Sequence, residues 1–398
     1  MKLKVGIGKI SLIVLSLIIL LLPICGCSQE QASEEVEIGA LFTLSGPMSA
    51  SFGRNADGVN AAAEWINEKG GISVAGKNYK IKIVPVDDGG TPDGAVAGMN
   101  QLVYDKKIKI MIVSPFPTFS IPSGEVSDAA QALRFKMGYM GLPGELTSYT
   151  IATHSEQPFV PDVFKSFVAT YPNVKTIACI APNDTAGLDS QQIDIQEAQK
   201  NGLSVVLEDT FEADATDYYP LCTKIIAAKP DAVSIAVGIP AWFGGILKQL
   251  RELGYNGPVF VPVNSADINL IKQIAGASAT DYFGLDIDPL SPDMPPIIKE
   301  IGSIIESKYN TELTVDHIYG WEALWDVAQA IESAQSFDPT VIRDTVQKMK
   351  SIETPYGSGT IGGEATYGFN NVIVRPQPII RIMNGEVIME EWLNPILP

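Results

Sequence analysis

Short apolar runs alternate with stretches of helical periodicity along most of this chain. Residues 36–42 form the first run, and apolar residues spaced from Val59 to Ile66 then mark one face of a helix that ends at Gly70. Runs that are apolar throughout and separated by helices are typical of a parallel sheet covered on both faces. Further strands are predicted over residues 80–86, 109–113, 135–140, 176–181, 204–208, 232–237, 259–263 and 282–285. The pattern predicts an α/β protein with two successive doubly wound, Rossmann-like series, the second starting near residue 157.

The last third of the chain changes its pattern. Helices are predicted over residues 294–308, 317–334 and 339–349, followed by a glycine-rich stretch and three short strands at residues 372–374, 378–383 and 386–391. Asn384 and Gly385 predict a two-residue hairpin turn between the last two strands. The GxGxxG match at residues 357–362 precedes no helix-forming run, so we interpret it as a crossover and not as a dinucleotide site.

The N-terminus carries a targeting pattern. Three lysines precede an apolar run at residues 10–22 that is short for a membrane span. The segment 24–27, Ile-Cys-Gly-Cys, resembles the lipobox of bacterial lipoproteins, which implies cleavage before Cys27 and lipid on its sulfur. We expect a signal peptide over residues 1–26 and a flexible tether over residues 27–35. A plain signal peptide or a retained anchor is the alternative. Either way, the folded part is expected outside the cytoplasmic membrane of a bacterium.

Composition and net charge exclude several classes of function. The 398 residues carry a formal charge of −18, with the acids interspersed, and this balance argues against nucleic-acid binding. His154 and His317 are the only histidines and lie far apart, so a zinc site or a Ser-His-Asp hydrolase has almost nothing to use, and we expect neither enzyme activity nor a cofactor. Cys179 and Cys222 are expected as buried thiols, with a disulfide as the alternative.

Several motifs in order resemble the branched-chain amino acid-binding branch of the type I periplasmic binding proteins. The resemblance covers the chain from Val36 to the C-terminus. Its motifs are Ile38-Gly39-Ala40-Leu41-Phe42, Ser45-Gly46-Pro47, Phe52-Gly53, Ile66-Asn67-Glu68-Lys69-Gly70-Gly71-Ile72, Asp87-Asp88, Glu145-Leu146-Thr147, Asn183-Asp184, the run from Leu247 to Gly254, Tyr319-Gly320-Trp321-Glu322-Ala323 and Asp338-Pro339.

The resemblance implies two lobes, a ligand cleft between them and hinge closure on binding. It places residues 36–152 and 286–355 in lobe I, and residues 153–285 and 356–398 in lobe II, with crossovers near residues 150–156, 282–289 and 354–362. It also implies delivery of a small-molecule ligand to the permease subunits of an ABC importer. We expect a monomer that meets the membrane through its N-terminal lipid.

The loop at residues 115–122 is the candidate carboxylate site. It precedes a helix predicted over residues 123–133, whose free N–H groups and dipole favour an anion. Thr118 and Ser120 would add hydroxyl donors, and the matching family segment grips the ligand carboxylate. Ser123 serves either this site or only as the helix cap.

The departures from the family concern the ligand's ammonium group. The family threonine falls on Leu142, next to Gly141, the tyrosine on Ile239 or Pro240, and the acid on Asn264. Apolar residues stand instead near the expected cleft: Phe52, Phe116, Phe119 and Trp242. We therefore expect an apolar or aromatic carboxylate or amide as ligand. A branched-chain amino acid bound with altered contacts and a ligand-sensing receptor subunit remain alternatives, while the absence of GxSxG and HExxH motifs disfavours an extracellular hydrolase.

Overall fold

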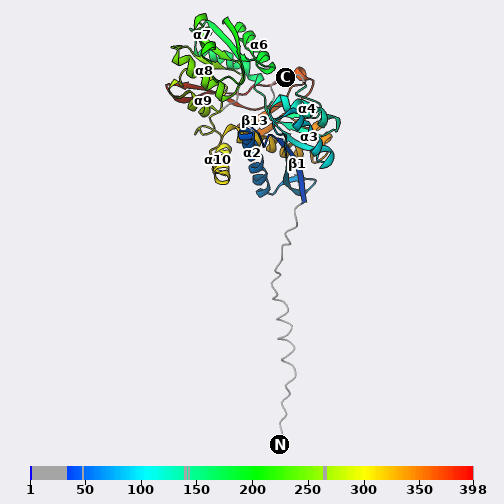
Figure 1. Ribbon diagram of the computed structural model, residues 1–398. Coiled ribbons are helices and arrows are strands. Elements are labelled where there is room, and N and C mark those ends of the chain that lie inside the picture. The colour runs from blue at the N-terminus through cyan, green and yellow to red at the C-terminus, as the bar shows by residue number, and fades with distance from the viewer. Residues whose placement is uncertain (2–33, 47–48, 139–140, 142–143, 263–266, 398) are drawn as a thin grey trace. The chain divides into compact units, whose positions relative to one another are not determined.

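The computed structural model describes Met1 and residues 34–46, 49–138, 141, 144–262 and 267–397 (Figure 1). Residues Glu35–Pro398 form one unit, separate from Met1–Glu34. Two sheets with helices on both faces make up this unit, as the apolar runs predict. Among the described residues, no helix has the length and apolar character needed to cross a membrane.

The first sheet has nine strands in the order β12-β13-β14-β6-β5-β4-β1-β3-β2. Its centre, from β14 through β6, β5 and β4 to β1, is parallel, and hairpins add antiparallel strands at both edges. The strands are β1 (Glu34–Phe42), β2 (Ile72–Val74), β3 (Lys77–Asp87), β4 (Ile110–Val113), β5 (Leu133–Lys136), β6 (Thr150–Ala152), β12 (Ser351–Thr354), β13 (Gly357–Gly362) and β14 (Val372–Val374).

The second sheet has seven strands in the order β16-β15-β11-β10-β9-β7-β8. Five of them are parallel, and the hairpin β15–β16 closes one edge with a turn at Asn384 and Gly385, both at positive φ, as predicted. The strands are β7 (Thr176–Pro182), β8 (Ser204–Phe211), β9 (Ala232–Ile235), β10 (Val259–Val261), β11 (Tyr282–Gly284), β15 (Gln377–Met383) and β16 (Glu386–Leu393).

Helices cover each sheet on both faces and enclose separate apolar cores. Figure 1 shows α6 to α9 gathered around the seven-stranded sheet. The helices are α2 (Ser49–Glu68), α3 (Pro92–Asn100), η1 (Gln101–Asp105), α4 (Pro117–Ala129), η2 (Gln157–Phe159), α5 (Val160–Thr170), α6 (Thr185–Lys200), α7 (Tyr219–Ala228), α8 (Pro240–Glu252), α9 (Ile268–Ala275), η3 (Gly276–Ser278), α10 (Pro296–Tyr309), α11 (Val315–Ala334), α12 (Pro339–Val346) and α13 (Glu364–Tyr367).

Helices α2 and α11 pack closely because both carry glycine at their contact. A Cβ atom on Gly58 would lie 2.0 Å from the carbonyl oxygen of His317, and one on Gly320 would lie 1.9 Å from that of Asn55. Any larger residue at either position would push the helices apart. The close packing buries Trp321 in the core of the nine-stranded sheet.

The chain passes between the sheets three times, after β6, after β11 and after β14. The third passage corrects the sequence interpretation, which put residues 356–374 with the second lobe. Strands β13 and β14 pair with β12 and β6 in the nine-stranded sheet, so the chain crosses at Arg375 and Pro376. The glycine-rich residues 357–362 form a hairpin strand and are not the crossover that their composition indicated.

Candidate ligand-binding site

The strand order marks one topological switch point in each sheet, where the order of the strands reverses and where open α/β folds bind ligands. In the nine-stranded sheet β1 lies between β3 and β4, and in the seven-stranded sheet β7 lies between β8 and β9. The loops at the carboxyl ends of such neighbouring strands diverge to opposite faces and leave a crevice. The candidate site therefore has two halves, one at the ends of β1 and β4 and one at the ends of β7 and β9.

Helix α4 starts at the first of these points, earlier than the sequence indicates. It begins at Pro117 and not at residue 123, with Phe116 as the N-cap residue and Pro122 inside the helix. Proline suits the first helical position, because the N–H that it lacks would have no partner within the helix. Pro122 had indicated a loop instead. Phe119 and Ser120 donate their N–H groups to the carbonyl of Phe116, so the N–H of Thr118 is the first-turn donor left for a ligand among the described residues.

The predicted site residues of α4 face in two directions. Phe116 is 40% exposed and stacks on the buried Phe119, with ring centroids 5.9 Å apart. Thr118 is exposed. Ser120 is buried, and its Oγ has no hydrogen-bond partner among the described residues. Ser123 does not cap the helix, since its Oγ donates to the carbonyl of Phe119 at 2.7 Å. Phe116 and Thr118 are thus the residues of this group that a ligand can reach from solvent.

A buried carboxylate lies beside Ser120. Asp88 accepts hydrogen bonds at Oδ1 from Thr43 Oγ1 at 2.6 Å and from the N–H of Gly90 at 2.8 Å. Its Oδ2 has no partner in the part of the chain that the structure describes. Asp88, Ser114 and Ser120 line one small gap. The sequence interpretation used Asp88 only as a family motif, although an acid directly after an apolar strand at a switch point is a signal for a site residue.

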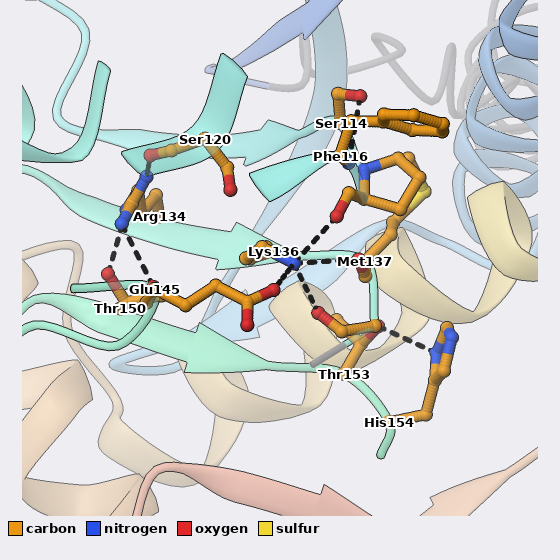
Figure 2. A network of polar contacts seen from close by, with 12 residues as sticks. Ser114, Phe116, Ser120, Arg134, Lys136, Met137, Glu145, Thr150, Thr153 and His154 are labelled. Carbon is orange, nitrogen blue, oxygen red and sulfur yellow. Dashed lines mark hydrogen bonds and ion pairs between the residues drawn. The ribbon is translucent and has the colours of Figure 1, made fainter. Parts of the chain in front are cut away.

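Two buried cations lie under the start of α4 (Figure 2). Arg134 donates from Nε to Thr150 Oγ1 at 2.7 Å and from its guanidinium to the carbonyl of Ser120. Burial lowers the pKa of Arg134 to about 10. Lys136 forms an ion pair of 2.6 Å with Glu145, and both side chains are fully buried. The sequence analysis missed both cations, although two charges inside an apolar strand are a signal, because buried charges are rare.

The second half of the site starts at helix α8. Ile239 is its N-cap residue, is 42% exposed and makes no side-chain cap. Trp242 is half-buried in the first turn, and its Nε1 donates to the carbonyl of Ala213 at 3.2 Å. Trp242 also lines an open groove of about 520 Å³ between α8 and the loop before α7. Ile239 thus lies at the switch point, whereas the groove beside Trp242 extends along α8.

Two exposed apolar residues at the switch points escaped the sequence analysis. Leu44, 38% exposed, follows β1, and Leu188, 43% exposed, lies in the first turn of α6 after β7. Each half of the site therefore presents two large apolar side chains to solvent, Leu44 with Phe116 and Leu188 with Ile239. A single exposed leucine leaves no mark on a hydrophobic pattern, so no sequence signal could have found them.

The remaining predicted residues are only partly described. Leu142, Asn264 and Cys27 lie outside the described residues, and of Phe52 only its place in the helix α2 is described. Gly141 is described and has φ +84°, and a Cβ atom there would lie 2.1 Å from the side chain of Gln157. Only glycine fits this position.

The two cysteines are free and buried, which confirms the expectation of buried thiols. Burial raises the pKa of the Cys222 thiol to about 12 and that of Cys179 further. Within the described ranges, no group of three or more His, Cys, Asp or Glu side chains has an arrangement suited to a metal ion.

A cluster of buried charges connects two of the chain passages with α11. Arg375, after β14, pairs with Glu322 of α11 at 3.2 Å, and its guanidinium lies 4.2 Å from the ring centre of Tyr356. His154, after β6, lies 3.6 Å from the other Glu322 oxygen. Burial raises the pKa of Glu322 to about 8, opposed by the charge of Arg375, and holds the pKa of His154 well below its usual value. The histidine is therefore neutral in this cluster.

Two Rossmann-like lobes, each with a switch point, define a binding protein of the type I periplasmic architecture. The chain belongs to the periplasmic binding protein family, whose sequence model matches residues 35–375. An amino acid binding protein of Pseudomonas aeruginosa is 31% identical over 342 residues, which cover 82% of this chain and 86% of the relative. The protein is therefore a substrate-binding protein of the branched-chain amino acid-binding branch and not an enzyme, and the family implies an extracytoplasmic location.

Solved structures with the same fold hold different ligands. The branched-chain amino acid transporter substrate-binding protein LivJ of Streptococcus pneumoniae, in complex with isoleucine, has a TM-score of 0.72 and 20% identity and covers 92% of this chain and 100% of its own. A second structure is a solute-binding protein of an ABC transporter from Rhodopseudomonas palustris in complex with 3,4-dihydroxybenzoic acid. It has a TM-score of 0.74 and 17% identity, and the match covers 91% of this chain and 98% of its own. At these identities the structures establish the fold alone.

Proposed function

We propose that the protein binds a small carboxylate or amide with an apolar or aromatic body and delivers it to an ABC importer by hinge closure. The observation that carries the proposal is the start of the two helices at the switch points. Both α4 and α8 begin with an exposed apolar N-cap residue, Phe116 and Ile239, whose side chain does not cap the helix, followed by a proline. Phe119 and Trp242 donate their N–H groups to the N-cap carbonyls, so among the described residues one first-turn N–H per helix, that of Thr118 in α4 and that of Ala241 in α8, remains for an oxygen of a ligand, where the helix dipole favours an anion.

Four other helices of the same sheets have an N-terminus closed by a side-chain cap, whereas α5, α7 and α10 also begin without one. Thr91, Asp184, Asp267 and Asp338 cap α3, α6, α9 and α12 with their own side-chain oxygens. A side-chain oxygen on Phe116 or Ile239 would occupy the same N–H groups. Apolar residues at these two positions supply apolar contact and leave the donors free.

The α-amino group of an amino acid would find poor partners at the family positions. The resemblance places Leu142 and either Ile239 or Pro240 where the family has hydroxyl-bearing residues, and Asn264 where it has an acid. An unpaired ammonium buried against these side chains would cost several kcal/mol. This argument favours a ligand without an amino group, such as the aromatic acid held by the Rhodopseudomonas palustris protein.

A branched-chain amino acid bound with altered contacts is the second candidate. The Pseudomonas aeruginosa relative bears the name amino acid binding protein. Asp88 Oδ2, buried and without a partner among the described residues, is an acceptor that an ammonium group would need. Its burial beside Ser120 makes such contact depend on a rearrangement of the α4 start.

A matched pair of ligands decides between the two candidates. Isoleucine and 3-methylpentanoate differ only in the α-amino group, and benzoate with 3,4-dihydroxybenzoate tests the aromatic class. We expect thermal shifts and calorimetric binding with 3-methylpentanoate or the benzoates, and weak or no binding of isoleucine. A ligand at one hundred times its Kd stabilises the folded state by about 2.7 kcal/mol, which a thermal scan resolves. Submicromolar binding of isoleucine would overturn the assignment.

Hinge closure has its own test. X-ray scattering of the protein with a saturating ligand from this panel should give a smaller radius of gyration than without it. Equal radii would contradict closure.

We also propose that a lipid on Cys27 anchors the protein. The support is the segment Ile24-Cys25-Gly26-Cys27, which resembles a lipobox. The expected tether over residues 27–35 ends before Glu34, because Glu34 and Glu35 belong to β1.

A further inference from the structure

The side chain of Lys136, the last residue of β5, uses all of its hydrogen-bonding capacity inside the protein. Its Nζ lies 2.6 Å from Glu145 Oε1, and it donates to the carbonyls of Pro115 at 2.8 Å and Gly138 at 2.7 Å (Figure 2). An ammonium group has three N–H donors, so these three acceptors saturate it. Lys136 therefore has no donor left for a ligand.

The three acceptors belong to the segments that frame the first half of the candidate site. Pro115 lies in the β4–α4 loop directly before Phe116, Gly138 lies two residues after β5, and Glu145 lies in the described residues 144–149 before β6. The backbone carbonyl of Glu145 also accepts from Arg134 at 3.2 Å, and this guanidinium bonds the carbonyl of Ser120. The lysine and its acid thus connect the start of α4 with the segment after β5.

We propose that Lys136 and Glu145 are a positioning pair that holds two segments, residues 115–120 and residues 144–149, in the ligand-binding arrangement. Their role in ligand binding rests on the proposed function, whereas their role in ordering the segments does not. Burial lowers the pKa of Lys136, and the charge of Glu145 opposes this shift.

Stability alone gives no reason for such a pair. The desolvation of two buried charges offsets most of their attraction, and apolar residues of similar size often serve the fold equally well. An apolar pair, however, cannot donate to the carbonyls of Pro115 and Gly138. The expected consequence of an apolar replacement is a folded protein whose two segments are less ordered.

The double variant Lys136→Met with Glu145→Leu tests this consequence in the absence of any ligand. Hydrogen exchange is measured for the backbone amides of residues 116–120 and 144–149 and for the strands β4 and β7. We expect exchange about 10-fold faster in the two segments, the factor that one lost hydrogen bond corresponds to, and unchanged exchange in the strands. Glu145→Gln keeps an acceptor for Lys136 but removes its counter-charge, so it should lower the stability in urea while exchange in the two segments stays slower than in the double variant.

A control variant removes a second ion pair, which lies at the protein surface. Lys224 and Asp209, 2.7 Å apart at the seven-stranded sheet, are replaced by Met and Leu, and this variant should leave exchange in both segments unchanged. Unchanged exchange in the Lys136 and Glu145 double variant would overturn the proposal. Failure of this variant to fold under conditions where Glu145→Gln folds would also overturn it, because the pair would then be a requirement of folding.

Binding of 3-methylpentanoate and 3,4-dihydroxybenzoate distinguishes failure of the positioning role from failure of the proposed function. A variant with less ordered segments should bind its probe about 10-fold more weakly than the Glu145→Gln variant. Absence of binding of both probes to the unchanged protein would contradict the proposed function, while the exchange result would still decide the positioning role. Equal affinity in a variant with faster exchange would show that these segments do not hold the ligand, and would overturn the proposal.

Discussion

Truncation of Phe116 to alanine tests the apolar character of the candidate site most directly. Phe116 is the N-cap residue of α4, and 40% of its surface is exposed without a ligand. A phenylalanine side chain offers about 200 Å² to burial, so about 80 Å² remains for a ligand to cover. At about 25 cal/mol per Å² this area corresponds to about 2 kcal/mol, or a Kd about 30-fold weaker in Phe116→Ala.

Calorimetric titration with 3-methylpentanoate and 3,4-dihydroxybenzoate measures this loss. Leu253→Ala is the matched control, since Leu253 is 41% exposed but is the C-cap residue of α8, at the opposite end of that helix from Ile239. The control should bind like the unchanged protein, and both variants should remain folded because neither side chain is a core residue. Equal affinities of Phe116→Ala and Leu253→Ala would refute the argument that exposed apolar residues at the switch points take the ligand.

Three further predictions concern stability and anchoring. The carboxyl of Asp194 is buried beside Ser234, and desolvation raises its pKa well above the usual value. Its protonated form therefore stabilises the fold at low pH, and Asp194→Asn should gain up to about 1.4 kcal/mol per pH unit over the unchanged protein above pH of about 4; parallel urea-denaturation profiles from pH 4 to 7 would contradict this. Arg375→Met should lower the stability in urea most above a pH of about 8, by up to about 3–5 kcal/mol, because the ionised Glu322 then loses its partner, and Glu322→Gln in the same chain should recover part of the loss; an unchanged midpoint at that pH would count against the pair. Cys27→Ala should release the protein from the membrane fraction or leave it unprocessed, and normal lipid labelling of that variant would exclude Cys27 as the anchor.

The fold followed from the sequence wherever the relevant signal was local. Residues 372–374 were predicted as a strand and form β14, and the Asn384-Gly385 turn joins β15 and β16 as expected. Partner choice is not local. The strand β13 pairs with β12 and β14 through contacts that glycine-rich composition does not encode, so its sheet was predicted wrongly.

The site was less predictable than the fold, because it depends on which way single side chains face. Thr118 and Ser120 lie two residues apart in one helical turn, yet Thr118 is exposed and Ser120 is buried. The residue at which α4 begins decides which of these side chains faces inward, and Pro122 led to a predicted helix start at residue 123 in place of Pro117. The buried charges of Arg134 and Lys136 depend on partners that come from distant parts of the chain, Glu145 among them.

The exposed apolar residues also explain why ligand and closure should be coupled in the proposed function. Leu44, Phe116, Leu188 and Ile239 each keep about two fifths of their surface in water, roughly 60–80 Å² apiece and together about 7 kcal/mol of gross apolar burial. Closure without a ligand would realise this energy only if the four side chains met one another, and any gap left between them would forfeit the contact. A ligand with an apolar body fills that gap. The free N–H donors at the starts of α4 and α8 additionally require that this ligand carry an oxygen that accepts their hydrogen bonds. Selectivity then requires both features in one molecule, which is why an apolar amine should fail as a ligand although it covers the same area.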